Sequence, residues 1–338
     1  MTALSDTPIA VLGAGSWGTA LAVLLAKKGQ SVRLWGHDLN HIQQMTQEGV
    51  NSRYLPHIAF PPALHLFHDL SSALKGVQDI VIVVPSRVFV ELLMRIKPYL
   101  LPETRLIWGT KGLTAQRELL HVAAQKIVGM HRSLAVLSGP SFATEVAKQL
   151  PTAVTLAAVN PQCGTFWSTL FSTEYFRVYT TNDMVGVEAC GVVKNTLAIA
   201  SGVVEELRLG ANALSALITR GLVEMQKFGM ALGGRSETFY GLAGLGDLVL
   251  SCTDNQSRNR RFGKAMAGGK SAADSLREIG QAVEGYANLE TVCQLARQQG
   301  VDMPITEQIY QMIYHKKSPQ DAIRTLFSRG LKGEYFEG

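Results

Sequence analysis

Hydrophobic residues before Thr181 fall into short, almost uninterrupted runs that are separated by glycines, prolines and polar stretches. Apolar runs of this length are typical of parallel strands that are buried on both faces. The runs lie at 9–12, 31–35, 79–84, 105–108 and 134–137, and two further β-rich segments lie at 152–159 and 175–179. The pattern therefore predicts a largely parallel sheet that the last two segments complete.

After Thr181 the pattern changes to one helix after another. Segment 182–207 contains no proline and begins with Asn182-Asp183, a pair suited to capping a helix. Segment 211–232 places its leucine, isoleucine and methionine side chains at helical spacing. We therefore expect an α/β chain: an N-terminal Rossmann-type doubly wound sheet, the NAD(P)-binding domain, over residues 1–181, and an all-helical substrate-binding and catalytic domain over residues 182–338.

Lys194 is the unusual residue of the helix predicted at 182–207. Between positions 184 and 204 almost every face carries small or apolar residues, and the only charged residues are Glu188 and Lys194. They are six positions apart, which is the wrong spacing for pairing on a helix. A lysine in such surroundings needs a partner from elsewhere, or it loses its proton more easily than in water. Lys194 is thus a candidate for proton transfer, while a structural ion pair or a surface-seeking side chain remains open.

A glycine-rich turn follows the first predicted strand. Gly13, Gly15 and Gly18 form a GxGxxG pattern between the strand at 9–12 and a helical run at 19–28. In this setting the first glycine allows the turn, the second lets a pyrophosphate approach the backbone, and the third lets helix and strand pack closely. The helix N-terminus then faces the anion. The sequence predicts dinucleotide binding here.

The end of the second predicted strand bears on the choice of dinucleotide. An enzyme that prefers NAD usually ends this strand with an acid for the ribose hydroxyl, whereas this strand ends in Gly36-His37-Asp38. His37 can face a 2′-phosphate, so NADPH is favoured and NADH remains possible. We expect Asp38 to cap the helix at 39–47 rather than to bind ribose.

Several polar residues follow strands or glycine-rich turns and are candidates for a site. Lys111 and the 138–143 loop follow strands whose carboxyl ends meet at one edge of the sheet, where ligands bind in open α/β sheets. Asp247 is the one charge in segment 241–252, and either caps the next helix or pairs with Lys194. The run at 257–259 offers a hydroxyl, a guanidinium and an amide to a phosphate, unless it is a solvated basic turn.

Composition and charge exclude several classes of protein. The net charge of +5 is spread over 338 residues, so we expect no nucleic-acid-binding face. Segment 9–26 has no charge, but its glycines interrupt it, so no membrane span is expected. Four dispersed cysteines without a CxxC pair indicate a reducing compartment and no metal site, and residues 1–8 lack the basic start of a signal peptide. A cytoplasmic location is expected.

Nine short segments, taken together and in this order, resemble the bacterial-type NAD(P)-dependent glycerol-3-phosphate dehydrogenases. The segments are GAGSWG (13–18), NSRYLP (51–56), TKGL (110–113), SGPSFATEVA (138–147), ACGVVKN (189–195), ALITRGL (216–222), GLAGLGDLVLSC (241–252), QSRNRRFG (256–263) and VEGY (283–286). The resemblance implies reversible reduction of dihydroxyacetone phosphate to sn-glycerol 3-phosphate, which supplies glycerophospholipid synthesis. It also implies a homodimer.

The resemblance assigns roles to individual positions. Lys194 would exchange the proton with the substrate, Lys111 would polarise the reacting oxygen, and Asp247 would orient both lysines. The implied substrate-binding positions are Lys111, Gly139, Ser141, Lys194, Asp247, Ser257, Arg258 and Asn259. The implied cofactor-binding positions are Gly13, Gly15, Ser16, Trp17, Gly18, His37, Tyr54, Lys111, Ala143, Arg258, Val283 and Glu284.

Two other functions remain in competition. One is a related Rossmann-plus-helical reductase that acts on another small hydroxy acid. The basic run near Arg258 favours a phosphorylated substrate instead. The other is a dinucleotide sensor without catalysis, which would need no buried proton donor at Lys194. Histidine, the usual general acid or base, is absent between His131 and His315, so a dehydrogenase on this chain would most naturally use a lysine.

Overall fold

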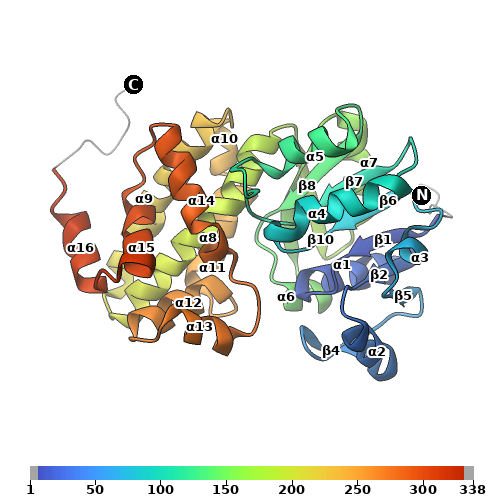
Figure 1. Cartoon of the computed structure of the whole chain (residues 1–338), viewed down its shortest axis with the longest axis horizontal. Coiled ribbons are helices and arrows are strands. Elements are labelled where there is room, and N and C mark those ends of the chain that lie inside the picture. The colour runs from blue at the N-terminus through green and yellow to red at the C-terminus, as the bar shows by residue number, and fades with distance from the viewer. Residues whose placement is uncertain (1–6, 331–338) are drawn as a thin grey trace.

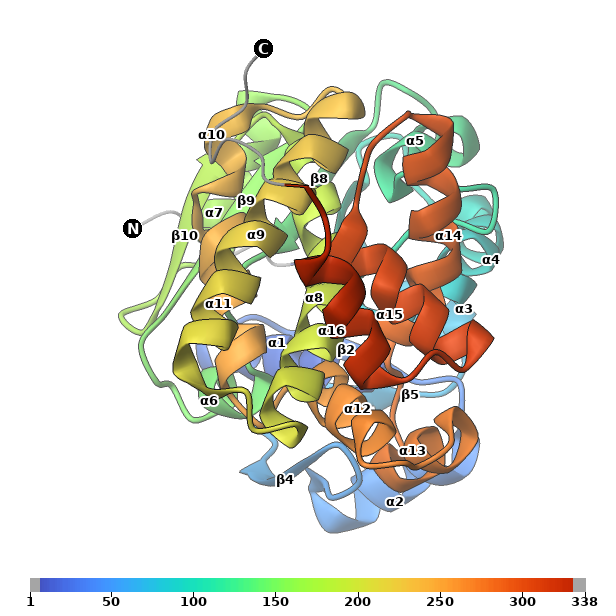
Figure 2. The same cartoon turned by 90° about the vertical axis from the view of Figure 1, so that its left-hand side faces the viewer.

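A computed structural model describes residues 7–330 of the chain. A sheet flanked by helices forms one part, and a helical bundle forms the other, with helix α8 between them (Figure 1). The predicted fold class is confirmed: the last strand ends at Thr181 and the first helix of the bundle begins at Met184. Figure 2 shows helices α9, α15 and α16 on the side of the bundle that faces away from the sheet.

The sheet has eight strands in the order β10-β9-β8-β7-β6-β1-β2-β5. Its strands are β1 (Ile9–Leu12), β2 (Val32–Trp35), β5 (Leu64–Phe67), β6 (Asp79–Ile82), β7 (Arg105–Trp108), β8 (Ser133–Ser138), β9 (Thr152–Ala158) and β10 (Phe176–Thr181). A separate two-stranded sheet joins β3 (Val50–Asn51) to β4 (Leu55–Ala59). All neighbours in the large sheet run parallel except β8 and β9, which are antiparallel.

Every predicted strand is present, and the sequence analysis missed β3, β4 and the edge strand β5. The helices of the sheet part are α1 (Ser16–Lys27), α2 (Leu39–Glu48), α3 (Leu70–Leu74), α4 (Ser86–Ile96), the 3₁₀ turn Lys97–Tyr99, α5 (Leu120–Val128), α6 (Ala143–Ala147) and α7 (Pro161–Phe171). The bundle contains α8 (Met184–Glu206), α9 (Gly210–Ala231), α10 (Ser236–Phe239), the π turn Leu242–Gly246, α11 (Asp247–Thr253), α12 (Arg258–Ala267), α13 (Ala272–Ile279), α14 (Glu284–Gln298), α15 (Pro304–His315) and α16 (Pro319–Phe327).

Side chains of each strand alternate between two cores, one on either face of the sheet. Ile9 and Val11 of β1 join the core beneath α1 and α7, where Trp167 of α7 is fully buried. Ala10 and Leu12 join the opposite core, which contains residues of α4 and α5 and continues into α8. The sheet and the bundle therefore share one continuous hydrophobic core, and this fixes α8 against the sheet.

Helix α8 is buried along most of its length, as the sequence predicted. It is long and apolar enough to cross a membrane, but 94% of that stretch is enclosed by the rest of the protein. Its charge Glu188 accepts hydrogen bonds from the Trp108 indole at 2.9 Å and from His121 Nδ1 at 2.8 Å. Burial opposes protonation of His121, yet this carboxylate raises the pKa of its imidazole. Glu188 thus ties α8 to both β7 and α5.

Glycines allow α8 and α12 to approach at backbone contact. A Cβ on Gly263 of α12 would lie 1.9 Å from the carbonyl oxygen of Ile199, and one on Gly202 of α8 would lie 2.0 Å from that of Arg260. Distances this short are incompatible with any side chain. The close crossing holds the N-terminal turn of α12, which carries Arg258 and Asn259, beside α8.

We predict that Gly263→Ala lowers the free energy of unfolding by about 1–3 kcal/mol, because the new methyl group forces α12 away from α8. Gly164→Ala is the matched control in helix α7, where the nearest atom to a new Cβ is 3.6 Å away. That control should be neutral or stabilising by up to about 1 kcal/mol, because alanine favours helix over glycine. Urea denaturation followed by circular dichroism measures both, and equal midpoints for the two variants would contradict the prediction.

Candidate active site

The glycine-rich turn between β1 and α1 has the shape that a dinucleotide requires. Gly13 has a φ of +123°, and a Cβ there would lie 2.3 Å from the carbonyl oxygen of Val83. A Cβ on Gly18 would lie 1.9 Å from the carbonyl oxygen of Gly13, whereas one on Gly15 would meet no atom within 4 Å. The first and third glycines are therefore needed for packing, and the second faces open space. Helix α1 begins at Ser16, so its N-terminal amides face the same space.

Several residues that the sequence analysis assigned to the cofactor lie near this turn. Asp38 caps α2 by accepting a hydrogen bond from the His41 amide at 3.2 Å, as predicted, and His37 is exposed just after β2. Tyr54 is partly exposed and contacts the His41 ring edge-on. The Trp17 indole lies against the backbone of Gly109, where a Cβ would be 2.6 Å from its nitrogen.

Asn51 supports the glycine-rich turn and was missed by the sequence analysis. Its buried amide donates to the carbonyl oxygen of Ala14 at 3.0 Å and to the Thr19 hydroxyl at 2.8 Å. Its oxygen lies 3.0 Å from Nε2 of His41. Asn51 therefore connects the turn to α2. The only sequence signal was its place in NSRYLP (51–56).

Two lysines share one buried carboxylate at the junction of the sheet and the bundle. Asp247 lies 3.0 Å from the Lys194 ammonium and 2.5 Å from that of Lys111, through different oxygens. Lys194 comes from α8, Asp247 from the first turn of α11, and Lys111 from the connection after β7. The partner that Lys194 lacks on its own helix is thus Asp247, as the sequence analysis proposed. Its other interpretation, that Asp247 is an N-cap, is wrong, because Asp247 lies in the first turn with Gly246 at the cap.

The cluster alters the titration of both buried groups. Lys194 is 8% exposed and Asp247 is 2% exposed. Burial lowers the pKa of Lys194 to about 8, although the charge of Asp247 opposes this and that of Lys111 adds to it. Burial alone would raise the pKa of Asp247, but the two ammonium groups hold it below its ordinary value. The site therefore contains a carboxylate that stays ionised and an amine that exchanges its proton near neutral pH.

Ser251 completes the environment of Lys194 and was also missed. Its hydroxyl accepts a hydrogen bond from the Lys194 ammonium at 2.7 Å and lies 3.4 Å from the carboxylate of Asp247. Ser251 is four residues after Asp247 on α11, so the two face the same way. That spacing is the signal that could have identified it.

Gly191 lets Lys111 cross the surface of α8. A Cβ at this position would lie 3.3 Å from Cγ of Lys111 and 3.5 Å from the hydroxyl of Ser138. Glycine leaves the lysine stem room to reach Asp247. The neighbouring loop is also close, since Pro140 lies against Gly246, with a Cβ there 3.6 Å from the proline ring. The structure thus brings Lys111, the start of the 138–143 loop and the Asp247 turn together.

The expected phosphate-binding residues lie at the start of α12. The Ser257 hydroxyl caps this helix by accepting from the Arg260 amide at 3.3 Å, and Arg258 donates to Gln281 at 3.3 Å. Burial lowers the pKa of Arg258, against the charge of Glu284. The structure thus places Arg258 near the start of α14, where Val283 is the residue before the helix and Glu284 is its first residue.

Asn259 is more constrained than the sequence suggested. Its amide nitrogen donates to the side-chain oxygen of Asn195 at 2.8 Å, and its oxygen accepts from the Gly285 amide at 2.9 Å. Asn195 in turn donates to the carbonyl oxygen of Gly191 at 3.0 Å. These bonds join α8, α12 and α14, and they leave one N–H of Asn259 for another partner. Asn195, adjacent to Lys194, was missed because its partners are distant in the sequence.

The remaining predicted residues belong to the 138–143 loop. Gly139 has a φ of +140°, and a Cβ there would lie 3.0 Å from Cα of Val154. The Ser141 hydroxyl donates to the carbonyl oxygen of Gly139 at 2.9 Å, so it points back onto its own loop. Ala143 is partly exposed at the start of α6. No three His, Cys, Asp or Glu side chains within residues 7–330 are arranged to hold a metal ion.

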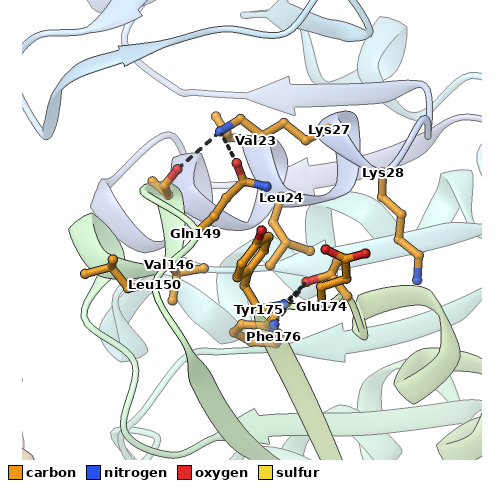
Figure 3. Close-up of a pocket in the computed structure, with 12 residues that line it drawn as sticks. Val23, Leu24, Lys27, Lys28, Val146, Gln149, Leu150, Glu174, Tyr175 and Phe176 are labelled. Atoms are coloured by element: carbon orange, nitrogen blue, oxygen red, sulfur yellow. Dashed lines mark hydrogen bonds between the residues drawn. The ribbon is translucent and has the colours of Figure 1, made fainter.

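A pocket of about 360 Å³ lies elsewhere, between α1, α6 and the start of β10 (Figure 3). Its lining includes Val23, Leu24 and Tyr175, together with two lysines at its edge. Lys28 donates to the carbonyl oxygens of Thr169, Leu170 and Ser172, so its ammonium group is already satisfied. None of the predicted site residues lines this pocket.

Comparison with known proteins agrees with this geometry. The models for the N-terminus and C-terminus of NAD-dependent glycerol-3-phosphate dehydrogenase match residues 8–164 and 183–324. The chain is 51% identical to a glycerol-3-phosphate dehydrogenase [NAD(P)+] of Coxiella burnetii (strain RSA 331 / Henzerling II), over 97% of this chain and 98% of that protein. It is 50% identical to the protein of that name from Tolumonas auensis, over 98% and 99%.

A crystal structure of glycerol-3-phosphate dehydrogenase from Coxiella burnetii superposes with a TM-score of 0.93 at 51% identity, covering 96% of this chain and 99% of that one. Both structural parts are included in this match, because it extends over almost the whole length. The glycine-rich turn, the shared carboxylate and the basic start of α12 thus occur in a chain that belongs to the NAD(P)-dependent glycerol-3-phosphate dehydrogenase family.

Proposed function

We propose that this chain catalyses the reversible reduction of dihydroxyacetone phosphate to sn-glycerol 3-phosphate with NAD(P)H, and so supplies glycerophospholipid synthesis. The observation that carries the proposal is the buried contact of Lys194 and Lys111 with opposite oxygens of Asp247, 3.0 and 2.5 Å away. The Lys111 connection begins at Gly109, against which Trp17 of the glycine-rich turn packs. The lysines therefore lie next to the place where a dinucleotide fits.

The cofactor would be held mainly by the turn between β1 and α1. The open space at Gly15 and the amides at the start of α1 fit a pyrophosphate. The residues that would hold the cofactor are Gly13, Gly15, Ser16, Trp17, Gly18, His37, Tyr54, Lys111, Ala143, Arg258, Val283 and Glu284. When bound, a reduced nicotinamide supplies the hydride, and the protein supplies position and electrostatics.

NADPH is the preferred cofactor in this proposal, with NADH also accepted. Asp38 is already used as a helix cap, so it is a poor partner for a ribose hydroxyl. His37 is exposed at the end of β2, and a guanidinium nitrogen of Arg53 lies 3.9 Å from the carboxylate of Asp38. Two basic side chains at this end of the strand suit a 2′-phosphate.

Lys194 is the proton donor in reduction. Negative charge develops on the carbonyl oxygen as its carbon accepts hydride, and the adjacent ammonium stabilises that charge and donates the proton. In the reverse direction the free amine takes the proton from the hydroxyl group. A pKa of about 8 makes both forms accessible near neutral pH.

The other residues of the cluster orient the reactants. Lys111 polarises the same oxygen, and Asp247 keeps both ammonium groups in place. Arg258 and its neighbours at the start of α12 bind the phosphate. The residues that would bind substrate are Lys111, Gly139, Ser141, Lys194, Asp247, Ser257, Arg258 and Asn259.

The two competing functions are less well supported. A reductase for an unphosphorylated hydroxy acid would leave the partly exposed Arg258 without a phosphate to bind. A sensor without catalysis would gain nothing from a buried amine that titrates near neutral pH beside an ionised carboxylate. Both alternatives predict that dihydroxyacetone phosphate does not accelerate NADPH oxidation.

We also propose that residues 1–181 and 182–338 act as the cofactor-binding and substrate-binding domains of a cytoplasmic homodimer. The four cysteines are free and buried, as in a reducing compartment. Residues 211–219 of α9 carry no charged side chain, and several of them are exposed, which suits contact with a second copy. Light scattering on the purified chain tests whether its mass is twice 36.7 kDa.

We predict that Asp247→Asn lowers the pKa of Lys194 below about 8, because it removes the charge that favours the ammonium form. The reduction rate then declines at a lower pH than in the wild type, since less Lys194 is protonated. NMR titration of ¹³C-labelled lysine side chains measures the shift directly. Ser251→Ala is the control that removes only a neutral acceptor, and it should move the pKa less. An unchanged or raised pKa in Asp247→Asn contradicts the electrostatic coupling.

We predict that Arg258→Met lowers kcat/KM for dihydroxyacetone phosphate about 10- to 100-fold, the loss expected for one hydrogen bond to a charged group. The reaction with unphosphorylated dihydroxyacetone should be weak and almost unaffected. Arg261→Met is the matched control, because Arg261 is exposed on the same helix. NADPH absorbance measures all four rates. Equal losses in the two variants, or equal wild-type activity on both substrates, would remove the phosphate-binding role.

A further inference from the structure

Asn288 links the Lys111 connection to helix α14. Its side-chain oxygen accepts a hydrogen bond from the backbone amide of Leu113 at 2.8 Å. Its side chain is 5% exposed, so this bond is shielded from water. Leu113 is two residues after Lys111. The bond therefore connects the loop that follows the sheet to a helix of the bundle.

The other half of the Asn288 amide contacts α4 and the first residue of its own helix. Its nitrogen donates to the Ser86 hydroxyl at 3.2 Å and to the Glu284 carboxylate at 3.0 Å. Ser86, at the start of α4, also donates to that carboxylate at 2.8 Å. Gly112 lies over this group, since a Cβ there would be 2.3 Å from Cβ of Ser86 and 2.9 Å from the Asn288 oxygen. One amide thus connects the start of α4, the Lys111 connection and the start of α14.

The Lys111 connection is also held by Leu113, which is buried in the core shared with the bundle, and by the Thr110 hydroxyl, which donates to the carbonyl oxygen of Val84 at 2.8 Å. Its backbone at Gly112 has a φ of +156°, and the stem of Lys111 crosses α8 at Gly191, where there is no side chain to guide it. Asp247 directs the Lys111 ammonium group. A separate contact is needed to fix the distance between α8 and the backbone of the Lys111 connection. The bond from Leu113 to Asn288 is the nearest buried link that does so among the described residues.

We infer that Asn288 is a positioning residue of the proposed reaction: it holds the Lys111 connection against α14 and thereby keeps Lys111 at Asp247 beside Lys194. This inference rests on the function proposed above. Asn288 is not one of the proposed substrate- or cofactor-binding residues, although its amide also donates to Glu284, which is one of them. The inferred effect on kcat runs through Lys111. Without its amide, the Leu113 N–H loses a buried partner and the loop moves outward toward water.

The test uses the full-length protein and compares Asn288→Ala with Gln294→Ala. Gln294 lies on the same helix and contacts the same connection, through Arg117 at 3.5 Å, but at a more exposed place. Asn288→Ala should lower kcat for dihydroxyacetone phosphate about tenfold or more, the effect expected when a reacting group is displaced by a fraction of an ångström to an ångström. Gln294→Ala should change kcat less than twofold. Asn288→Leu, which keeps the branching without the hydrogen bonds, provides a second variant if the alanine variant folds poorly.

Two readouts separate positioning from a general structural effect. The charges and polar groups that face Lys194 are Asp247, Lys111, Cys252 and Ser251, and Lys111 is the cation that disfavours the ammonium form. Displacing Lys111 should therefore raise the pKa of Lys194, which ¹³C NMR titration of lysine side chains measures without turnover. The second readout is a double-mutant cycle with Lys111→Met, in which Asn288→Ala should cause no further loss of kcat.

Each outcome is decisive. An unchanged Lys194 titration, a kcat within twofold of the wild type in both Asn288 variants, or an equal loss in the Lys111→Met background overturns the inference. A wild-type chain that is inactive on dihydroxyacetone phosphate overturns the proposed function instead, and the NMR titration still tests whether Asn288 positions Lys111.

Discussion

A single buried carboxylate with a lysine on each oxygen is the interaction on which the site depends. Asp247 lies 3.0 Å from Lys194 and 2.5 Å from Lys111, and all three groups are largely removed from water. Placing two like charges there is unfavourable unless a counter-charge is fixed between them. The carboxylate thus fixes the positions of both ammonium groups, and it opposes the lowering of the Lys194 pKa by burial, which leaves that pKa at about 8. Removing it would leave two cations in an apolar junction.

The fold supplies this cluster from three distant segments. Lys194 requires a buried helix, Lys111 requires the connection that follows a strand, and Asp247 requires the first turn of α11. The hydrophobic core that runs from the sheet into α8 keeps the first two in register. Gly191 leaves room for the Lys111 stem on α8, and Gly202 and Gly263 allow α8 and α12 to approach at backbone contact. Packing and chemistry are therefore coupled, because the small residues that allow close approach also open the path that Lys111 follows.

Features with local causes were predictable from the sequence. The strands followed from short apolar runs, the cap at Asp38 from its place before a helix, and the glycine-rich turn from its spacing. Because Lys194 has no counter-ion on its own helix, the sequence also predicted correctly that its partner, Asp247, comes from elsewhere in the chain. The short edge strand β5 was missed because His65 interrupts its apolar run, LHLF (64–67), and only Leu64 of the four residues is buried. The antiparallel direction of β9 was not foreseen, because it depends on pairing rather than on composition.

Residues that act through distant partners were not predictable. Asn51, Asn195 and Asn288 are buried amides whose hydrogen bonds reach elements far away in the sequence. Ser251 had a local signal, its position one turn after Asp247, but its contact with Lys194 required the packing of α8 against α11. An amide or hydroxyl in a sequence gives no sign of whether it will be buried. Its role becomes visible only when the elements that surround it are placed.

The most direct measurement is the rate of a single turnover with excess Lys194→Ala enzyme, bound NADPH and dihydroxyacetone phosphate. If Lys194 donates the proton, hydride transfer should slow by about 10²–10³-fold or more, while NADPH fluorescence titration shows nearly wild-type cofactor affinity. Hydride transfer at the wild-type rate would contradict the central role of this amine. Loss of NADPH binding together with the rate would instead place Lys194 in the cofactor site and not at the reacting oxygen.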